Sequence, residues 1–109
     1  MSTTNNRMVS MALIEQEAKK IYKQYYKTTF KPGALDKKTK ELIALGAAAI
    51  AGCQGCLKGH LRKSIGMGIT LDEIRETIAV ASGVAAASVI DATDIANAEL
   101  GIVTAEQDE

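Results

Sequence analysis

The sequence predicts an all-α protein, a small subunit of about four to six helices that assembles with copies of itself. Apolar residues recur at spacings of three and four along most of the chain, no run alternates like a half-buried strand, and glycines fall between the periodic segments. The chain has 109 residues, 47% of them hydrophobic, which is enough for one core. We therefore expect a flexible N-terminus over residues 1–9, one helical domain over 10–100 and a flexible acidic tail over 101–109.

The first helix is expected from about Met8 to Lys27. Its inner face is predicted from apolar and aromatic residues at helical spacing, which are Met11, Ile14, Ala18, Ile21, Tyr22 and Tyr25. The segment FKPGALD follows, in which Pro32 and Gly33 favour a turn and Asp36 is suited to cap the next helix.

The second helix is expected over Lys37–Ala51. The residues predicted for its inner face are Leu42, Leu45, Ala49 and Ile50. Gly52 and Gly55 loosen the chain around Cys53, and the third helix then covers about Gln54–Ile65. That helix ends at the segment GMG, because glycine is common at the C-terminal boundary of a helix.

The fourth helix begins after Thr70, which forms a capping box with Glu73, and is expected to run to Ala98 with a break near Gly83. Its middle, Thr77–Ile90, is apolar or small on every side. A helix without a polar face has to be covered all round, and so small a domain offers few partners for this. We therefore expect other subunits to cover it.

Charge and length exclude several classes of partner. The 13 basic residues balance the 13 acidic ones, so no overall basic field attracts nucleic acid or an anionic membrane. The longest uncharged runs, Leu42–Leu57 and Thr77–Ile90, are shorter than the roughly 20 apolar residues that span a bilayer. The segment MSTTNNRMVS lacks the apolar region of a secretory signal. We expect a cytoplasmic protein that binds neither nucleic acid nor membrane.

The segment AGCQGCLKGH contains both cysteines and the only histidine of the chain. Cys53, Cys56 and His60 lie at positions i, i+3 and i+7, which share one face of a helix. The dipole and the free N–H groups at a helix start stabilise a thiolate. His60, one turn beyond Cys56, can exchange a proton with that thiol or stabilise its anion. The arrangement indicates redox chemistry.

Two other interpretations of these residues are a structural role in the core and the binding of a metal ion. Cysteines are among the most buried residue types, and a lone histidine is commonly a hydrogen-bonded core group. Zinc accepts two cysteines and one histidine, but a structural site has four ligands and the chain contains no further Cys or His. We therefore expect no bound metal and no cofactor other than the two thiols themselves.

Glu41 lies twelve residues before Cys53. Along one straight helix this separation is about 18 Å, which prevents contact. If the chain reverses near Gly52, the two helices become antiparallel and Glu41 lies about one turn from His60, where it can orient the imidazole or take its proton. From spacing alone, a solvated position beside the neighbouring lysines is the favoured interpretation, since the residues around it are Lys37, Lys38 and Lys40.

The segment KELIALGAAAIAGCQGCLKGHLRKSIGMGITLDEIRETI resembles the carboxymuconolactone decarboxylase superfamily, in particular its alkylhydroperoxidase D-like (AhpD-like) branch. The shared pattern is E-x11-C-x2-C-x3-H, followed by a G-x-T/S-x-x-E-I turn and a long alanine-rich helix. Glu41, Cys53, Cys56 and His60 match it position by position, and the resemblance covers about Lys31 to Glu99.

This resemblance implies an all-α subunit in trimers or hexamers and an antioxidant, peroxiredoxin-like activity that reduces hydroperoxides through a dithiol–disulfide cycle. It implies that Cys56 attacks the peroxide, that Cys53 resolves the sulfenic acid, and that His60 and Glu41 form the proton relay. The position at the helix start favours Cys53 as the more acidic thiol, whereas the neighbouring imidazole favours Cys56. We assign the attack to Cys56, because a paired imidazole is the more specific influence on a thiol. An external dithiol or protein reductant has to reopen the disulfide.

The chain departs from this branch at one position, because Gly55 stands where the enzymes have a histidine before the second cysteine. Part of their proton relay is therefore missing. The lactone-decarboxylating branch typically lacks the cysteine pair, so decarboxylation of γ-carboxymuconolactone ranks below peroxide reduction. Two alternatives stay open: a disulfide reductase or redox sensor of the same fold, and a non-enzymatic oligomer that binds a metal or small ligand at a subunit junction.

Overall fold

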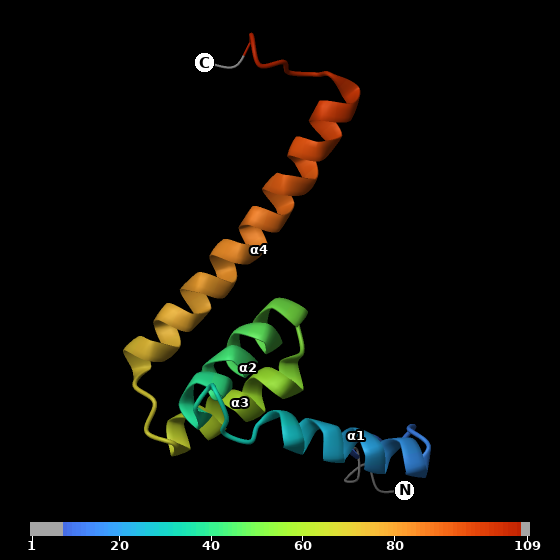
Figure 1. Ribbon diagram of the computed structural model, residues 1–109, viewed down its shortest axis with the longest axis vertical. Helices are drawn as coiled ribbons and strands as arrows, with labels where there is room; N and C mark the ends of the chain where they lie inside the picture. Colours follow the sequence, from blue (N-terminus) through green and yellow to red (C-terminus); the bar gives the residue numbers. More distant parts are fainter. Residues whose placement is uncertain (1–7, 108–109) are drawn as a thin grey trace, which may run out of the picture.

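The computed structural model describes residues 8–107 and is all-α over that range, as predicted (Figure 1). Its helices are α1 (Gln16–Thr29), α2 (Lys37–Ala51), α3 (Gln54–Gly66) and α4 (Leu71–Leu100). α2 packs against both α3 and α4. α1 leads away from the α2–α3 pair, and the C-terminal half of α4 extends beyond it (Figure 1).

The α2–α3 pair is formed by local signals that the sequence contains. The Asp36 side chain accepts a hydrogen bond from the Thr39 N–H and caps α2, as predicted. Gly52 ends α2 in the left-handed conformation at φ 70°, which glycine adopts without strain. Cys53 follows as the N-cap of α3. The chain thus reverses at Gly52, and α2 and α3 run antiparallel.

α1 begins later than predicted. It starts at Gln16 instead of Met8, because the Glu15 carboxylate accepts hydrogen bonds from the backbone N–H groups of Glu17 and Ala18 and caps the helix there. The preceding Met11 has φ 58°, which a continuous α-helix does not contain. No residue of α1 is buried within the single chain, so the predicted inner face has no core to cover.

α4 is one continuous helix, and the predicted break at Gly83 is wrong. One glycine in a helix interior costs only about 1 kcal/mol relative to alanine, which a helix of 30 residues absorbs. The capping box of Thr70 and Glu73 is present, as predicted. After α4, the Asn97 side chain exchanges two hydrogen bonds with the backbone of Val103. The flexibility expected of residues 1–9 and 101–109 stays a prediction, and 1–7 and 108–109 lie outside the described residues.

The core lies where α2, α3 and the start of α4 meet. Its buried centre is formed by Leu45, Ile69 and Ile74, and partly buried apolar side chains surround it: Leu42, Leu57, Leu61, Met67 and Ile78. At Gly46, α2 lies beside α4: a Cβ at this position would be 3.6 Å from the Thr77 methyl group, an ordinary van der Waals distance. Ile50, predicted to face inward, is 52% exposed because it lines an open groove between α2 and α4.

The single chain is extended and leaves much apolar surface exposed. Its radius of gyration is 19.9 Å, against about 13 Å for a compact domain of this length. Among the 30 residues of α4 only Ile74 and Ala81 are buried. By length and composition alone α4 could cross a membrane, although its uncharged run Thr77–Ile90 is shorter than a span requires.

Candidate active site

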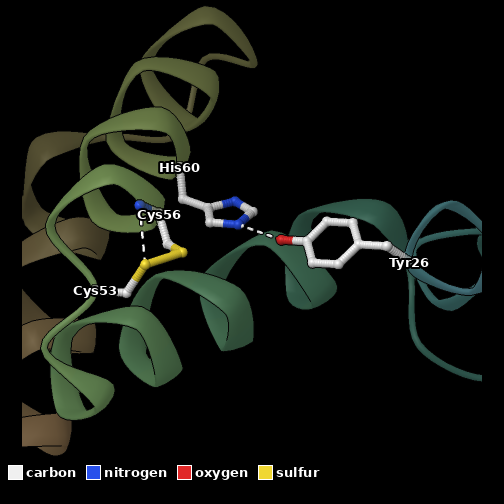
Figure 2. Close-up of a disulfide and its surroundings, with 4 residues drawn as sticks. All are labelled: Tyr26, Cys53, Cys56 and His60. Carbon is white, nitrogen blue, oxygen red and sulfur yellow. Dashed lines mark hydrogen bonds between the residues drawn. A yellow bond between two sulfur atoms is a disulfide. The ribbon is translucent and has the colours of Figure 1, made fainter. Parts of the chain in front are cut away.

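The two cysteines form a disulfide at the start of α3, with an S–S distance of 2.07 Å. Cys53 is the N-cap, and its Sγ accepts a hydrogen bond from the Cys56 N–H at 3.3 Å (Figure 2). Cys56 is exposed, whereas Cys53 is half-buried. Both sulfurs therefore lie at the positive end of a helix dipole, and Cys56 is the one that a reactant reaches more easily.

His60 lies one turn beyond Cys56 on α3, with its imidazole beside the disulfide (Figure 2). Its Nδ1 is 2.6 Å from Oε2 of Glu41, which comes from α2. Glu41 is buried, with only 1% of its side chain exposed, so the solvated position favoured by spacing alone is not the one observed. The antiparallel turn at Gly52 produces this contact.

Lys63 is the second partner of the buried Glu41 side chain. Its ammonium lies 3.4 Å from Oε1 of Glu41, the oxygen that has no hydrogen-bond partner among the described residues. The same ammonium lies 4.9 Å from the centre of the Phe30 ring. Lys63 thereby connects the Glu41–His60 pair to α1. A buried carboxylate is costly unless it is paired, and His60 and Lys63 together provide the pairing.

The sequence alone did not predict that α1 contributes to the site. The Tyr26 hydroxyl lies 2.7 Å from Nε2 of His60 (Figure 2). The Phe30 ring stacks on the imidazole at 5.7 Å between centroids and an interplanar angle of 19°. Tyr26 and Phe30 are spaced i and i+4 and share one helix face. That spacing was the available signal, but the predicted inner face used Tyr22 and Tyr25 instead.

A shallow apolar groove of about 300 Å³ lies over the disulfide. It is lined by Tyr26, Phe30, Ala44, Ala47, Ala48, Ala51, Cys53, Cys56 and His60. The four alanines come from α2, and the two aromatic rings come from α1 and its C-cap. A small molecule with an apolar body can therefore contact the disulfide and the imidazole together.

The hydrogen bonds determine how the imidazole can act. A carboxylate accepts only, so Nδ1 of His60 carries the proton that is donated to Glu41, and Nε2 is the nitrogen that accepts, here from the Tyr26 hydroxyl. Glu41 fixes the orientation of the ring in the same way that carboxylates orient histidines in other sites. Cys53, Cys56 and His60 thus line one groove, and the buried Glu41 contacts His60.

The carboxymuconolactone decarboxylase family model matches residues 16–98. This match covers most of the chain, and the protein therefore belongs to the carboxymuconolactone decarboxylase family, within the superfamily that also contains the AhpD-like proteins.

Two curated relatives share part of the chain. An alkyl hydroperoxide reductase AhpD from Anaeromyxobacter dehalogenans is 36% identical over 59 residues, which are 54% of this chain and 31% of that protein. The uncharacterized protein 4 in the cox locus of Paracoccus denitrificans is 43% identical over 56 residues, or 51% of this chain and 50% of that protein. The chain thus matches half or less of the length of each of these relatives.

Two solved structures have the same fold. A protein from Methanobacterium thermoautotrophicum superposes with a TM-score of 0.71 at 24% identity, covering 75% of this chain and 94% of that one. A carboxymuconolactone decarboxylase family protein from Thermotoga maritima, for which a role in the antioxidative response has been suggested, gives a TM-score of 0.63 at 30% identity over 75% and 84% of the two chains.

Proposed function

We propose that the protein is a thiol-dependent peroxidase that reduces hydroperoxides through the Cys53–Cys56 pair. The observation that carries this proposal is an accessible disulfide at a helix start, beside a histidine that a buried carboxylate orients, in an apolar groove. The likeness to an alkyl hydroperoxide reductase and to a family member with a suggested antioxidative role supports it.

In the proposed reaction the reduced protein attacks with Cys56, because this sulfur is the more exposed. The thiolate takes the terminal oxygen of the hydroperoxide, the O–O bond breaks, and Cys56 becomes a sulfenic acid while an alkoxide leaves. The Cys53 thiol then displaces hydroxide from that sulfur, which forms the disulfide and releases water. Two electrons and two protons of the dithiol convert the hydroperoxide to an alcohol and water.

Regeneration uses an external dithiol. Its thiolate attacks the exposed Cys56 sulfur, and Cys53 leaves as a thiolate. Cys53 suits this role because its Sγ accepts the N–H of Cys56 at the helix start, where negative charge is stabilised. The second thiol of the reductant then releases Cys56. Apart from this dithiol or protein reductant, the proposed cycle requires neither a metal nor another cofactor, and a cytoplasmic location would supply the reductant.

We also propose that the protein works as a homo-oligomer, a trimer or hexamer, in which copies of the chain cover α4. The support is the exposed apolar surface of α4, including Val84, Val89 and Ile90, together with the extended shape of the single chain. Burial of such surface contributes about 25 cal/mol per Å². Light scattering of detergent-free protein tests it: a stable monomer, or a protein that partitions with membranes, contradicts it.

The experiment for the reaction itself starts from fully reduced protein. Addition of a hydroperoxide should consume two thiols per chain and form an intrachain Cys53–Cys56 disulfide, detected by mass spectrometry of non-reduced peptides. Continued turnover with a dithiol distinguishes a peroxidase from a disulfide reductase or redox sensor, which the exposed disulfide would also suit. Elemental analysis of reduced, untagged protein that finds stoichiometric metal would instead favour the non-enzymatic alternative.

A further inference from the structure

The nitrogen of His60 that is able to accept a proton does not point freely into the groove. Nδ1 is held by Glu41, and Nε2 lies 2.7 Å from the hydroxyl of Tyr26. Because Nδ1 carries the proton, Nε2 accepts and the phenol O–H donates. The Tyr26 oxygen therefore occupies the hydrogen-bonding direction of Nε2, beside the groove that both residues line.

The position of Tyr26 allows it to contact a bound reactant. Its ring lines the same groove as Cys53 and Cys56, and it packs at a tilt against Phe30, with 5.0 Å between the ring centroids. Burial, with Tyr22 and Glu41 nearby, raises the pKa of the phenol above its ordinary value. The hydroxyl therefore keeps its proton at neutral pH, as a proton donor has to.

We propose that Tyr26 is the terminal proton donor of a Glu41–His60–Tyr26 relay, and that it protonates the alkoxide that leaves when the O–O bond of a hydroperoxide breaks. This inference rests on the proposed peroxidase function. It assigns a catalytic role to α1, the helix that the sequence did not connect with the site.

The proton balance of the relay closes within the site. When the Cys56 thiol ionises, the Tyr26 oxygen accepts its proton while the phenol passes its own proton to Nε2, and His60 becomes an imidazolium beside Glu41. When the alkoxide leaves, the phenol gives it a proton and recovers one from Nε2. The thiol proton thus ends on the alcohol, and Tyr26 and His60 return to their first state.

The test compares two oxidants with different leaving groups. Attack on tert-butyl hydroperoxide releases a strongly basic alkoxide that needs a proton, whereas attack on peracetic acid releases acetate, which does not. Both reactions start from the same thiolate, so effects on thiol ionisation cancel in the ratio of the two rates. Tyr26→Phe keeps the ring and its stacking and removes only the hydroxyl, and Tyr25→Phe on the same helix is the matched control.

We expect Tyr26→Phe to lower the ratio of the rate with tert-butyl hydroperoxide to the rate with peracetic acid by about 10²-fold, the scale of a lost general acid. Tyr25→Phe should change neither rate. An equal loss with both oxidants would mean that Tyr26 only supports the site, and no loss with either would remove it from the proton path. Wild-type protein that reduces neither oxidant would refute the proposed peroxidase function itself, and the relay with it.

Discussion

The α2–α3 pair and the middle of α4 distribute polarity in opposite ways. Glu41 on α2 is an acidic residue and only 1% exposed, whereas Val89 on α4 is apolar and 66% exposed. Glu41 has His60 and Lys63 as partners inside the chain, so its burial is compensated. Val89 has no such cover. The comparison shows that the polar groups of the proposed site are paired within one chain, while α4 exposes apolar surface that the proposed oligomer would cover.

The largest effect should come from replacing the two cysteines, both of which belong to the α2–α3 pair. Cys56→Ser should abolish peroxide consumption, because a hydroxyl at neutral pH is too weak a nucleophile to replace a thiolate. Cys53→Ser should permit one attack and leave Cys56 as a sulfenic acid that cannot be resolved within the chain. Dimedone labelling and mass spectrometry of each variant measure this. Sulfenic acid on Cys53 of Cys56→Ser would reverse the two roles.

Removal of the imidazole should have the next largest effect. His60→Ala should slow attack on peroxide near neutral pH by about 10²–10⁴-fold, the usual range for lost proton transfer, with partial recovery in alkali where the thiol ionises unaided. Glu41→Gln should lose less, since the amide still occupies the site and contacts Nδ1 of His60. Stopped-flow rates from pH 6 to 9 measure both, and equal losses in the two variants would contradict an orienting role for Glu41.

A charged residue introduced on the exposed apolar surface of α4 tests whether other copies of the chain cover that surface. Val89→Asp should shift the proposed oligomer toward the monomer of 11.5 kDa, because the carboxylate would lose its hydration in a subunit interface. If one chain holds the whole site, the monomer should still form the Cys53–Cys56 disulfide with peroxide. Light scattering and non-reducing peptide mapping measure the two results, and Lys58→Asp on the exposed face of α3 is the control. An unchanged mass would place Val89 outside any interface.

Loss of the N-cap of α4, which follows the α2–α3 pair in the chain, should have a smaller effect. Thr70 caps α4 through the Glu73 N–H, and Thr70→Ala should lower the free energy of unfolding by about 0.5–2 kcal/mol. Thr70→Ser keeps the hydroxyl and should recover most of this loss. Urea denaturation followed by circular dichroism measures both variants.

The smallest effect should come from protonation of Glu73, which lies in the first turn of α4. The Lys38 ion pair and the Thr70 backbone N–H hold the pKa of Glu73 below its ordinary value of 4.5. A carboxyl whose pKa is lowered by folding contributes stability above the ordinary pKa, and that contribution is lost as the pH falls through the folded value. The unfolding free energy should therefore drop less between pH 6 and pH 3 in Glu73→Gln than in the wild type. Urea titrations at the two pH values test this.

The sequence by itself determined the local features of this protein. The turn at Gly52, the caps at Asp36 and Thr70, and the helical spacing of the apolar residues depend on neighbours a few positions away, and they located α2, α3 and the start of α4. The cysteines and His60 could be assigned to one site for the same reason, since they lie within one short segment.

Only the tertiary structure decided which residues from different helices meet there. Glu41 became a buried partner of His60, against the solvated position that its lysine neighbours suggested, because the reversal at Gly52 places it opposite α3. Tyr26 reaches Nε2 across 34 positions of sequence, and no periodicity within α1 encodes that contact. Contacts of this kind depend on how helices are placed against one another, which the summed packing of the chain determines and a local pattern does not.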